Sequence, residues 1–102
     1  MYELEAMNGP LDGKRWAFSR DISIGRDGTT GAELSTDRAA SRRHAEVRVT
    51  PEGLRLADLD SRNGTLVDGS PIESPVIISV GQPFIVGRTM LRVVDQTSAE
   101  KA

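Results

Sequence analysis

Residues 44–59 read HAEVRVTPEGLRLADL, and the pattern of this stretch decides the fold class. Apolar and polar side chains alternate through residues 44–50, a turn sequence follows at 51–53, and leucines return at positions 54 and 56. A period of two places successive side chains on opposite faces of a β-strand. The stretch therefore predicts two antiparallel strands joined by a tight turn, with one face buried.

The same kind of run recurs on both sides of this hairpin, with Gly, Pro, Asn and Asp marking the turns. Further strands are predicted at residues 2–6, 14–18, 22–24, 32–34, 65–67, 76–78, 84–86 and 90–94. No stretch of about ten or more residues has helical periodicity. Ten or eleven short strands, repeating about every eight to twelve residues, predict an all-β sandwich or barrel.

The size of the chain fits one domain. It has 102 residues, of which 37% are apolar and 27% charged, close to the averages of globular proteins. We expect a single domain over residues 1–95, followed by a polar tail or the start of a linker at 96–102.

Composition argues against several classes of function. With no cysteine and one histidine, the chain lacks the usual ligands of zinc sites, so we predict no metal site and no cofactor. A formal charge of −2 argues against a sequence-independent nucleic-acid binder. No apolar run reaches the roughly 18 residues that span a bilayer, and no signal-peptide pattern is present. We therefore expect a soluble, cytoplasmic protein without membrane insertion.

Polar residues with phosphate-binding chemistry cluster at three junctions between predicted strands and loops. The clusters are Gly25-Arg26, Ser41-Arg42-Arg43-His44 and Ser61-Arg62-Asn63-Gly64-Thr65. They supply guanidinium groups, hydroxyls and a carboxamide, which together suit a dianionic phosphate and the peptide backbone around it. Eleven of the thirteen basic residues are arginines, whose planar fork donates two parallel hydrogen bonds to a phosphate.

The forkhead-associated (FHA) domain, a phosphothreonine-binding β-sandwich, has a signature that this chain resembles at Gly25-Arg26, Ser41-x-x-His44 and Asn63-Gly64-Thr65. The resemblance covers about residues 2–95. It implies a two-sheet, FHA/SMAD-like sandwich with binding loops at one end and no enzymatic activity. It also implies a partner phosphorylated on threonine, such as a Ser/Thr kinase or its substrate. The alternative is a phospho-independent scaffold or self-association domain of the same fold.

The resemblance assigns phosphopeptide contacts to five residues. It implies that Arg26 and Ser41 bind the phosphate, that Arg42 adds a further basic contact, and that Asn63 holds the ligand main chain. Arg62 stands where many family members carry a small hydroxyl residue that touches the phosphate. Its guanidinium could replace that contact or point to solvent, and we expect it to meet acidic residues beside the phosphothreonine.

Three further residues are implied to support the site, namely Gly25, His44 and Gly64. The resemblance implies that His44 braces the serine loop through hydrogen bonds. A catalytic Ser41–His44 pair would need a third orienting group, and the sequence does not offer one. Gly64 provides its backbone dihedral angles. Ala39 lacks the charged side chain with which some members read the third residue after phosphothreonine.

Other interpretations remain open from the residues alone. Arg26 suits a surface salt bridge with Asp27 or Glu33 as well as a phosphate contact. Ser41 and Asn63 are also common turn formers, with no need of a ligand.

Overall fold

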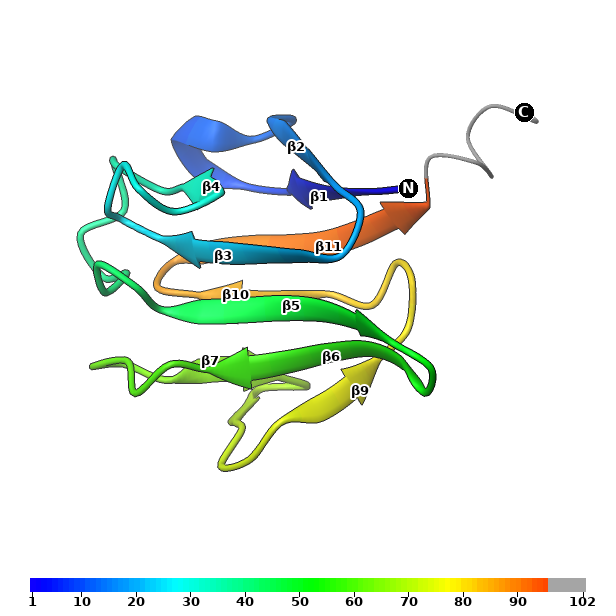
Figure 1. Cartoon of the computed structure of the whole chain (residues 1–102). Coiled ribbons are helices and arrows are strands. Elements are labelled where there is room, and N and C mark those ends of the chain that lie inside the picture. Colours follow the sequence, from blue (N-terminus) through cyan, green and yellow to red (C-terminus); the bar gives the residue numbers. More distant parts are fainter. Residues whose placement is uncertain (96–102) are drawn as a thin grey trace.

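The computed structural model describes residues 1–95, which form two packed β-sheets (Figure 1). The strands are β1 (Tyr2–Ala6), β2 (Arg15–Phe18), β3 (Asp21–Gly25), β4 (Ala32–Glu33), β5 (Ala45–Thr50), β6 (Gly53–Asp58), β7 (Thr65–Val67), β8 (Ser70–Pro71), β9 (Val76–Ile78), β10 (Phe84–Val86) and β11 (Thr89–Asp95), and a short 3₁₀ helix, η1 (Gly9–Leu11), lies between β1 and β2. The prediction of an all-β sandwich with ten or eleven strands is confirmed. The tail or linker expected at 96–102 lies outside the described residues.

The two sheets have different strand orders. One sheet runs β2-β1-β11-β10-β7-β8 and the other β4-β3-β5-β6-β9. Within residues 1–95, the strand pairs are antiparallel except the parallel pair of β3 with β4. The predicted hairpin is the pair β5 and β6, with Val47 opposite Leu56 and Val49 opposite Leu54. Strand β8 was not predicted, because two exposed residues are too short to show a periodic pattern.

The core lies between the sheets and is made of alternate residues from most strands. Its fully buried large side chains include Leu4, Ile24, Leu56, Phe84 and Leu91. Each such side chain contributes about 1.5–3 kcal/mol by leaving water. Because this burial holds the sandwich together, the loops at its ends are free to carry other chemistry.

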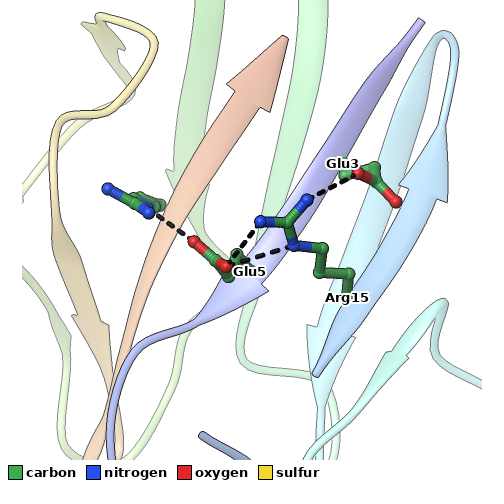
Figure 2. Close-up of polar contacts among 4 residues, drawn as sticks. Glu3, Glu5 and Arg15 are labelled. Carbon is green, nitrogen blue, oxygen red and sulfur yellow. Dashed lines mark hydrogen bonds and ion pairs between the residues drawn. The ribbon is translucent and has the colours of Figure 1, made fainter. Parts of the chain in front are cut away.

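The outer face of the six-stranded sheet carries a row of ion pairs, which we call the charge ladder (Figure 2). Glu5 lies between Arg92, at 2.7 Å, and Arg15, at 3.0 Å, and Arg15 also reaches Glu3 at 3.3 Å. The strand register produces this row, because Glu5 pairs with Arg92 of β11 and with Arg15 of β2. Burial acts to raise the pKa of Glu5, but hydrogen bonds from both arginines bring it below its ordinary value.

Four connections gather at one end of the sandwich, on the left in Figure 1. They are β3–β4, β4–β5, β6–β7 and β10–β11, and hydrogen bonds join β4–β5 to each of the other three. We call this the loop end. Within the described part of the chain, no helix is long and apolar enough to cross a membrane.

Candidate functional site

A hollow of about 360 Å³, the phosphate hollow, opens at the loop end. Its lining includes all five residues predicted to contact a phosphopeptide, namely Arg26, Ser41, Arg42, Arg62 and Asn63. Arg38, Ala39 and Ala40 complete the lining. The structure therefore brings together residues that are up to 37 positions apart in the sequence, Arg26 and Asn63 being the outermost.

Four guanidinium groups surround this hollow without a carboxylate partner. Among the described residues, no salt bridge involves Arg26, Arg38, Arg42 or Arg62. The alternative ion pair of Arg26 with Asp27 is absent, and the Asp27 carboxylate instead accepts hydrogen bonds from the Thr29 amide and hydroxyl at 2.9 and 3.1 Å. The side chains can therefore meet an external anion without first breaking an internal pair.

His44 joins two of the loops from a fully buried position, with 0% of its surface exposed. Its Nδ1 accepts a hydrogen bond from the Ser41 amide at 3.0 Å, and its Nε2 lies 2.8 Å from the Gly64 carbonyl oxygen. Since Nδ1 accepts, the ring proton sits on Nε2 and is donated to Gly64. The imidazole thus contacts the backbone of Ser41 and not its hydroxyl, which is the geometry of a brace.

The Ser41 hydroxyl faces the neighbouring loop. Its oxygen accepts a hydrogen bond from the Arg62 amide at 2.9 Å, and the hydroxyl hydrogen is left to donate to a ligand. The Ser41 carbonyl in turn accepts from the Arg26 amide at 3.0 Å. Ser41 is therefore fixed between Arg26 and Arg62 by hydrogen bonds from their main-chain amides, which leave both guanidinium groups unused.

Gly25 permits this loop to lie against the end of β3. A Cβ atom at Gly25 would collide with the carbonyl oxygen of Arg42. The residue is needed for close approach, since its φ does not lie in the left-handed region. Gly64, in contrast, has a φ of +82°, which a glycine adopts at least cost.

The Asn63 side chain joins two loops and still has hydrogen-bonding groups that no described residue uses. Its Nδ2 donates to the Ala39 carbonyl at 2.8 Å. The side-chain oxygen and the second amide hydrogen have no other bond among the described residues, so one acceptor and one donor face outward. Asn63 therefore does more than form a turn, and it retains the groups that an extended peptide backbone needs.

Asp58 shapes the β6–β7 loop, a role that was not predicted from the sequence. One carboxylate oxygen accepts from the hydroxyls of Ser61 and Thr65, and the other accepts from the Ser61 amide at 3.1 Å. Burial acts to raise the pKa of Asp58, yet these hydrogen bonds hold it below its ordinary value. The sequence does contain a signal for this motif, because an Asp three residues before a Ser in a turn cluster can accept hydrogen bonds from that Ser.

Asp37 anchors the β4–β5 loop to the turn between β10 and β11, and it too was missed. The residue is only 7% exposed, and its carboxylate accepts from the Thr89 hydroxyl at 2.6 Å, the Arg88 amide at 2.8 Å and the Ala39 amide at 3.0 Å. Burial acts to raise its pKa, but the bonds from Thr89 and the backbone amides lower it overall. No local pattern reveals a partner 52 residues away.

These two carboxylates predict a loss of stability in acid. Because the folded-state pKa values of Asp37 and Asp58 lie below their ordinary values, folding binds fewer protons, and stability is full above the unfolded pKa of about 4. It falls as the pH drops through the lower folded pKa. Urea unfolding from pH 7 to 2 should show a plateau and then a decline below about pH 4.

Two amide substitutions test this prediction, one at Asp37 and a matched control at Glu52. Asp37→Asn should be less stable at pH 7 and lose less on acidification, whereas Glu52→Gln, at an exposed turn, should retain the wild-type acid loss. If Asp37→Asn declined as steeply as the wild type, the acid sensitivity would come from other groups.

Metal binding has no visible basis in residues 1–95, where no three His, Asp or Glu side chains gather closely enough to hold an ion.

Comparison with known proteins gives one family. The sequence model of the FHA domain matches residues 22–87. The FHA domain-containing protein FhaB of Mycolicibacterium smegmatis is 33% identical over 94 residues, covering 89% of this chain and 59% of FhaB. The chain thus spans a little over half the length of that relative.

Solved structures agree with this family. The crystal structure of the FHA domain of CT664 from Chlamydia trachomatis has a TM-score of 0.83 and 26% identity, covering 92% of this chain and 96% of that domain. An FHA domain solved in an analysis of phosphothreonine-dependent interactions has a TM-score of 0.77 and 27% identity, covering 93% of this chain and 96% of that one.

Proposed function

Because this chain belongs to the FHA domain family, we propose that it is a phosphothreonine-dependent module that binds a phosphorylated protein in Ser/Thr kinase signalling. FHA domains are interaction modules, and we assign the chain no catalytic step. One observation carries the proposal: the phosphate hollow gathers four unpaired guanidinium groups and the Ser41 hydroxyl in one place. The solved FHA domain with phosphothreonine-dependent interactions supports the same chemistry.

The phosphate would be held by charge. A phosphothreonine carries about −1.5 to −2 charges near neutral pH, and its three terminal oxygens accept hydrogen bonds. Arg26 and Arg42 supply the guanidinium donors, and Ser41 supplies its free hydroxyl hydrogen. Charged hydrogen bonds contribute roughly 1.5–3 kcal/mol each, and ordering the peptide offsets part of the total. A dissociation constant near micromolar, which corresponds to a binding free energy of about −8 kcal/mol, suits a small reversible interface of this kind.

The peptide backbone would be held by Asn63, whose outward donor and acceptor match an extended main chain. The Arg62 amide already bonds to Ser41, so that residue is fixed at the edge of the hollow while its side chain is free. We propose that the Arg62 guanidinium meets acidic residues beside the phosphothreonine. We propose that the partner is a threonine-phosphorylated protein of the cytoplasm, such as a Ser/Thr kinase or its substrate.

The supporting residues would lower the cost of binding. Gly25 lets the serine loop lie on β3, and His44 joins Ser41 to Gly64 from the interior. A site already held in its binding shape loses little conformational entropy when the ligand arrives. The affinity of the module therefore depends on buried groups that never touch the ligand.

Three matched peptides test the proposed function. Calorimetry should give a micromolar dissociation constant for a phosphothreonine peptide and no detectable binding for its unmodified form. The phosphoserine form should bind more than about fourfold more weakly, because the threonine methyl adds about 0.8 kcal/mol and β-branching restricts χ1 before binding. Equal affinity for modified and unmodified peptides would instead identify a phospho-independent scaffold.

A further inference from the structure

The outer face of the six-stranded sheet carries, beside the charge ladder, a second row of side chains that is apolar. The strand register sets Met90 of β11 and Leu66 of β7 directly on either side of Ile85 of β10. Pro71 of β8 lies beyond Leu66, and Met7 lies beyond Met90, whose carbonyl oxygen accepts a hydrogen bond from the Met7 amide at 2.8 Å. We call these five residues the apolar row.

The apolar row faces away from the core. Successive residues of a strand point to opposite faces, and the row residues alternate with the buried Phe84, Val86 and Leu91. The outer face of the five-stranded sheet is polar by comparison, since β3, β5 and β6 present there Ser23, Glu46, Arg48 and Arg55. A sheet face in contact with water is normally polar, so the apolar row marks a surface suited to contact with protein.

The apolar row and the charges beside it are related by a half-turn about Ile85. Strands β11 and β7 run in the same direction, because both are antiparallel to β10. Arg92 follows Met90 by two residues, and Asp68 follows at the same interval after Leu66 on the other side of β10. A half-turn about an axis along β10 therefore returns the apolar row onto itself and exchanges a basic position with an acidic one.

Both of these charged residues are accessible to a second molecule. The Arg92 side chain is 40% exposed, and its ion pair with Glu5 uses Nε at 2.7 Å. Asp68 is exposed in the turn between β7 and β8 and forms no salt bridge among residues 1–95.

We propose that a second copy of this chain covers the apolar row, in a two-fold dimer whose six-stranded sheets pack face to face. Sheets packed in this way keep their strand directions within about 30°, so the two-fold axis runs close to the direction of β10. The two apolar rows then pack on each other, with Ile85 on the axis. Arg92 of each copy lies opposite Asp68 of the other, which gives two equivalent ion pairs, as a two-fold interface requires.

The area of the face predicts a weak and reversible dimer. Six strands spaced about 4.8 Å apart, and up to seven residues long, form a face of roughly 25 Å by 20 Å. Two such faces bury on the order of 1,000 Å² in total, which is the lower limit for specific interfaces. A formal charge of only −2 for each copy adds little repulsion. We expect a dissociation constant of about 10–100 μM.

The direction of the axis also determines how the two phosphate hollows are presented. Because the axis runs along the strands, the loop ends of both copies lie at the same pole of the dimer. A partner phosphorylated at two threonines would then contact both hollows and bind more tightly than either hollow alone allows. This consequence rests on the proposed function, whereas the dimer itself does not.

Sedimentation equilibrium from about 5 μM to about 1 mM brackets the expected dissociation constant and tests the dimer. Ile85→Lys sets two ammonium groups against each other on the axis, so it should weaken dimerisation by at least about 100-fold. In the monomer the lysine stem can lie along the sheet with its charge in water, and a thermal melt checks that the variant folds. Ile77→Lys is the matched control, because Ile77 is 51% exposed on β9 of the other sheet, and it should dimerise as the wild type does.

A second variant tests the ion pairs and preserves the turn. Asp68 has a φ of +53°, a conformation that asparagine also adopts readily. Asp68→Asn should therefore keep the turn and weaken dimerisation about three- to tenfold at low ionic strength, as the loss of two exposed ion pairs would. Glu52→Gln, in an exposed turn of the other sheet, should leave the dimerisation constant unchanged.

The outcomes decide the proposal without any phosphopeptide. A wild-type protein that stays monomeric over the whole range would overturn it. So would a folded Ile85→Lys variant that dimerises normally, or loss of the dimer in Ile77→Lys, because the contact would then lie on another face. If Ile85→Lys did not fold, Asp68→Asn would decide, and an unchanged dimerisation constant in that variant would overturn the arrangement. Failure of phosphopeptide binding would remove the proposed function and leave the dimer standing.

Discussion

Replacement of Arg26 by Ala should reduce the affinity for a phosphothreonine peptide by roughly 100-fold or more, because a bidentate guanidinium provides two charged hydrogen bonds of about 1.5–3 kcal/mol each. The free energy of unfolding should change by less than about 0.5 kcal/mol, as is usual for exposed positions. Arg26 is exposed. The hydrogen bond from its main-chain amide to the Ser41 carbonyl would remain in the alanine variant. Calorimetry and a thermal melt on the same protein measure both effects.

Two controls sharpen the test of Arg26. Arg26→Lys keeps the positive charge but loses the planar fork, so its affinity should fall between those of the wild type and alanine. Arg55→Ala removes an exposed arginine of β6 that lies outside the phosphate hollow, and its affinity should match the wild type. An unaltered affinity in Arg26→Ala would remove phosphate binding from this site.

Replacement of His44 by Ala should lower stability and affinity together. The change leaves the half-buried amide of Ser41 and the half-buried carbonyl of Gly64 without their partner, at about 1–3 kcal/mol each. It also opens a cavity where a fully buried ring had packed. We expect a loss of about 3 kcal/mol in unfolding free energy and a melting temperature lower by at least about 10 °C.

Binding by the His44 variant is to be measured well below its melting temperature, so that every molecule is folded. The affinity should still fall, because the serine loop and the Gly64 loop are no longer joined and ligand binding must order them. A reduced affinity at an unchanged melting temperature would mean that His44 touches the ligand directly. An unchanged affinity in a destabilised protein would mean that the loops hold their shape without it.

The fold could be predicted because its signal is local. Alternation over residues 44–50 and 54–56 placed Val47 and Leu56 on one face, and both are fully buried in β5 and β6. The candidate site could be predicted through its resemblance to the FHA signature, because Gly25-Arg26, Ser41-x-x-His44 and Asn63-Gly64-Thr65 stand in the order of that family. Strand β8 was not predicted because it has only two residues, both exposed. It is a strand only by its pairing with β7 across the intervening turn.

The rest of the site depends on contacts between distant positions, which a single sequence does not display. Nothing near Asp37 indicates that Thr89 supplies a hydroxyl to it, and nothing near Gly25 indicates that the Arg42 carbonyl lies over its Cα. Arg38 is not distinguished from other loop arginines in the sequence, and only the fold places it in the lining of the phosphate hollow. Packing in three dimensions determines these roles, and pattern along the chain does not.

The charge ladder also affects where on the surface the electrostatic potential is strong. Glu3, Glu5, Arg15 and Arg92 neutralise one another on the outer sheet face, so this face projects little field into solvent. Among the described residues, the guanidinium groups that line the phosphate hollow form no salt bridge, so their positive charge stays local although the formal charge of the whole chain is −2. For the proposed phosphopeptide ligand, we expect this charge to steer encounters toward the loop end, and we expect the association rate to fall as added salt screens it.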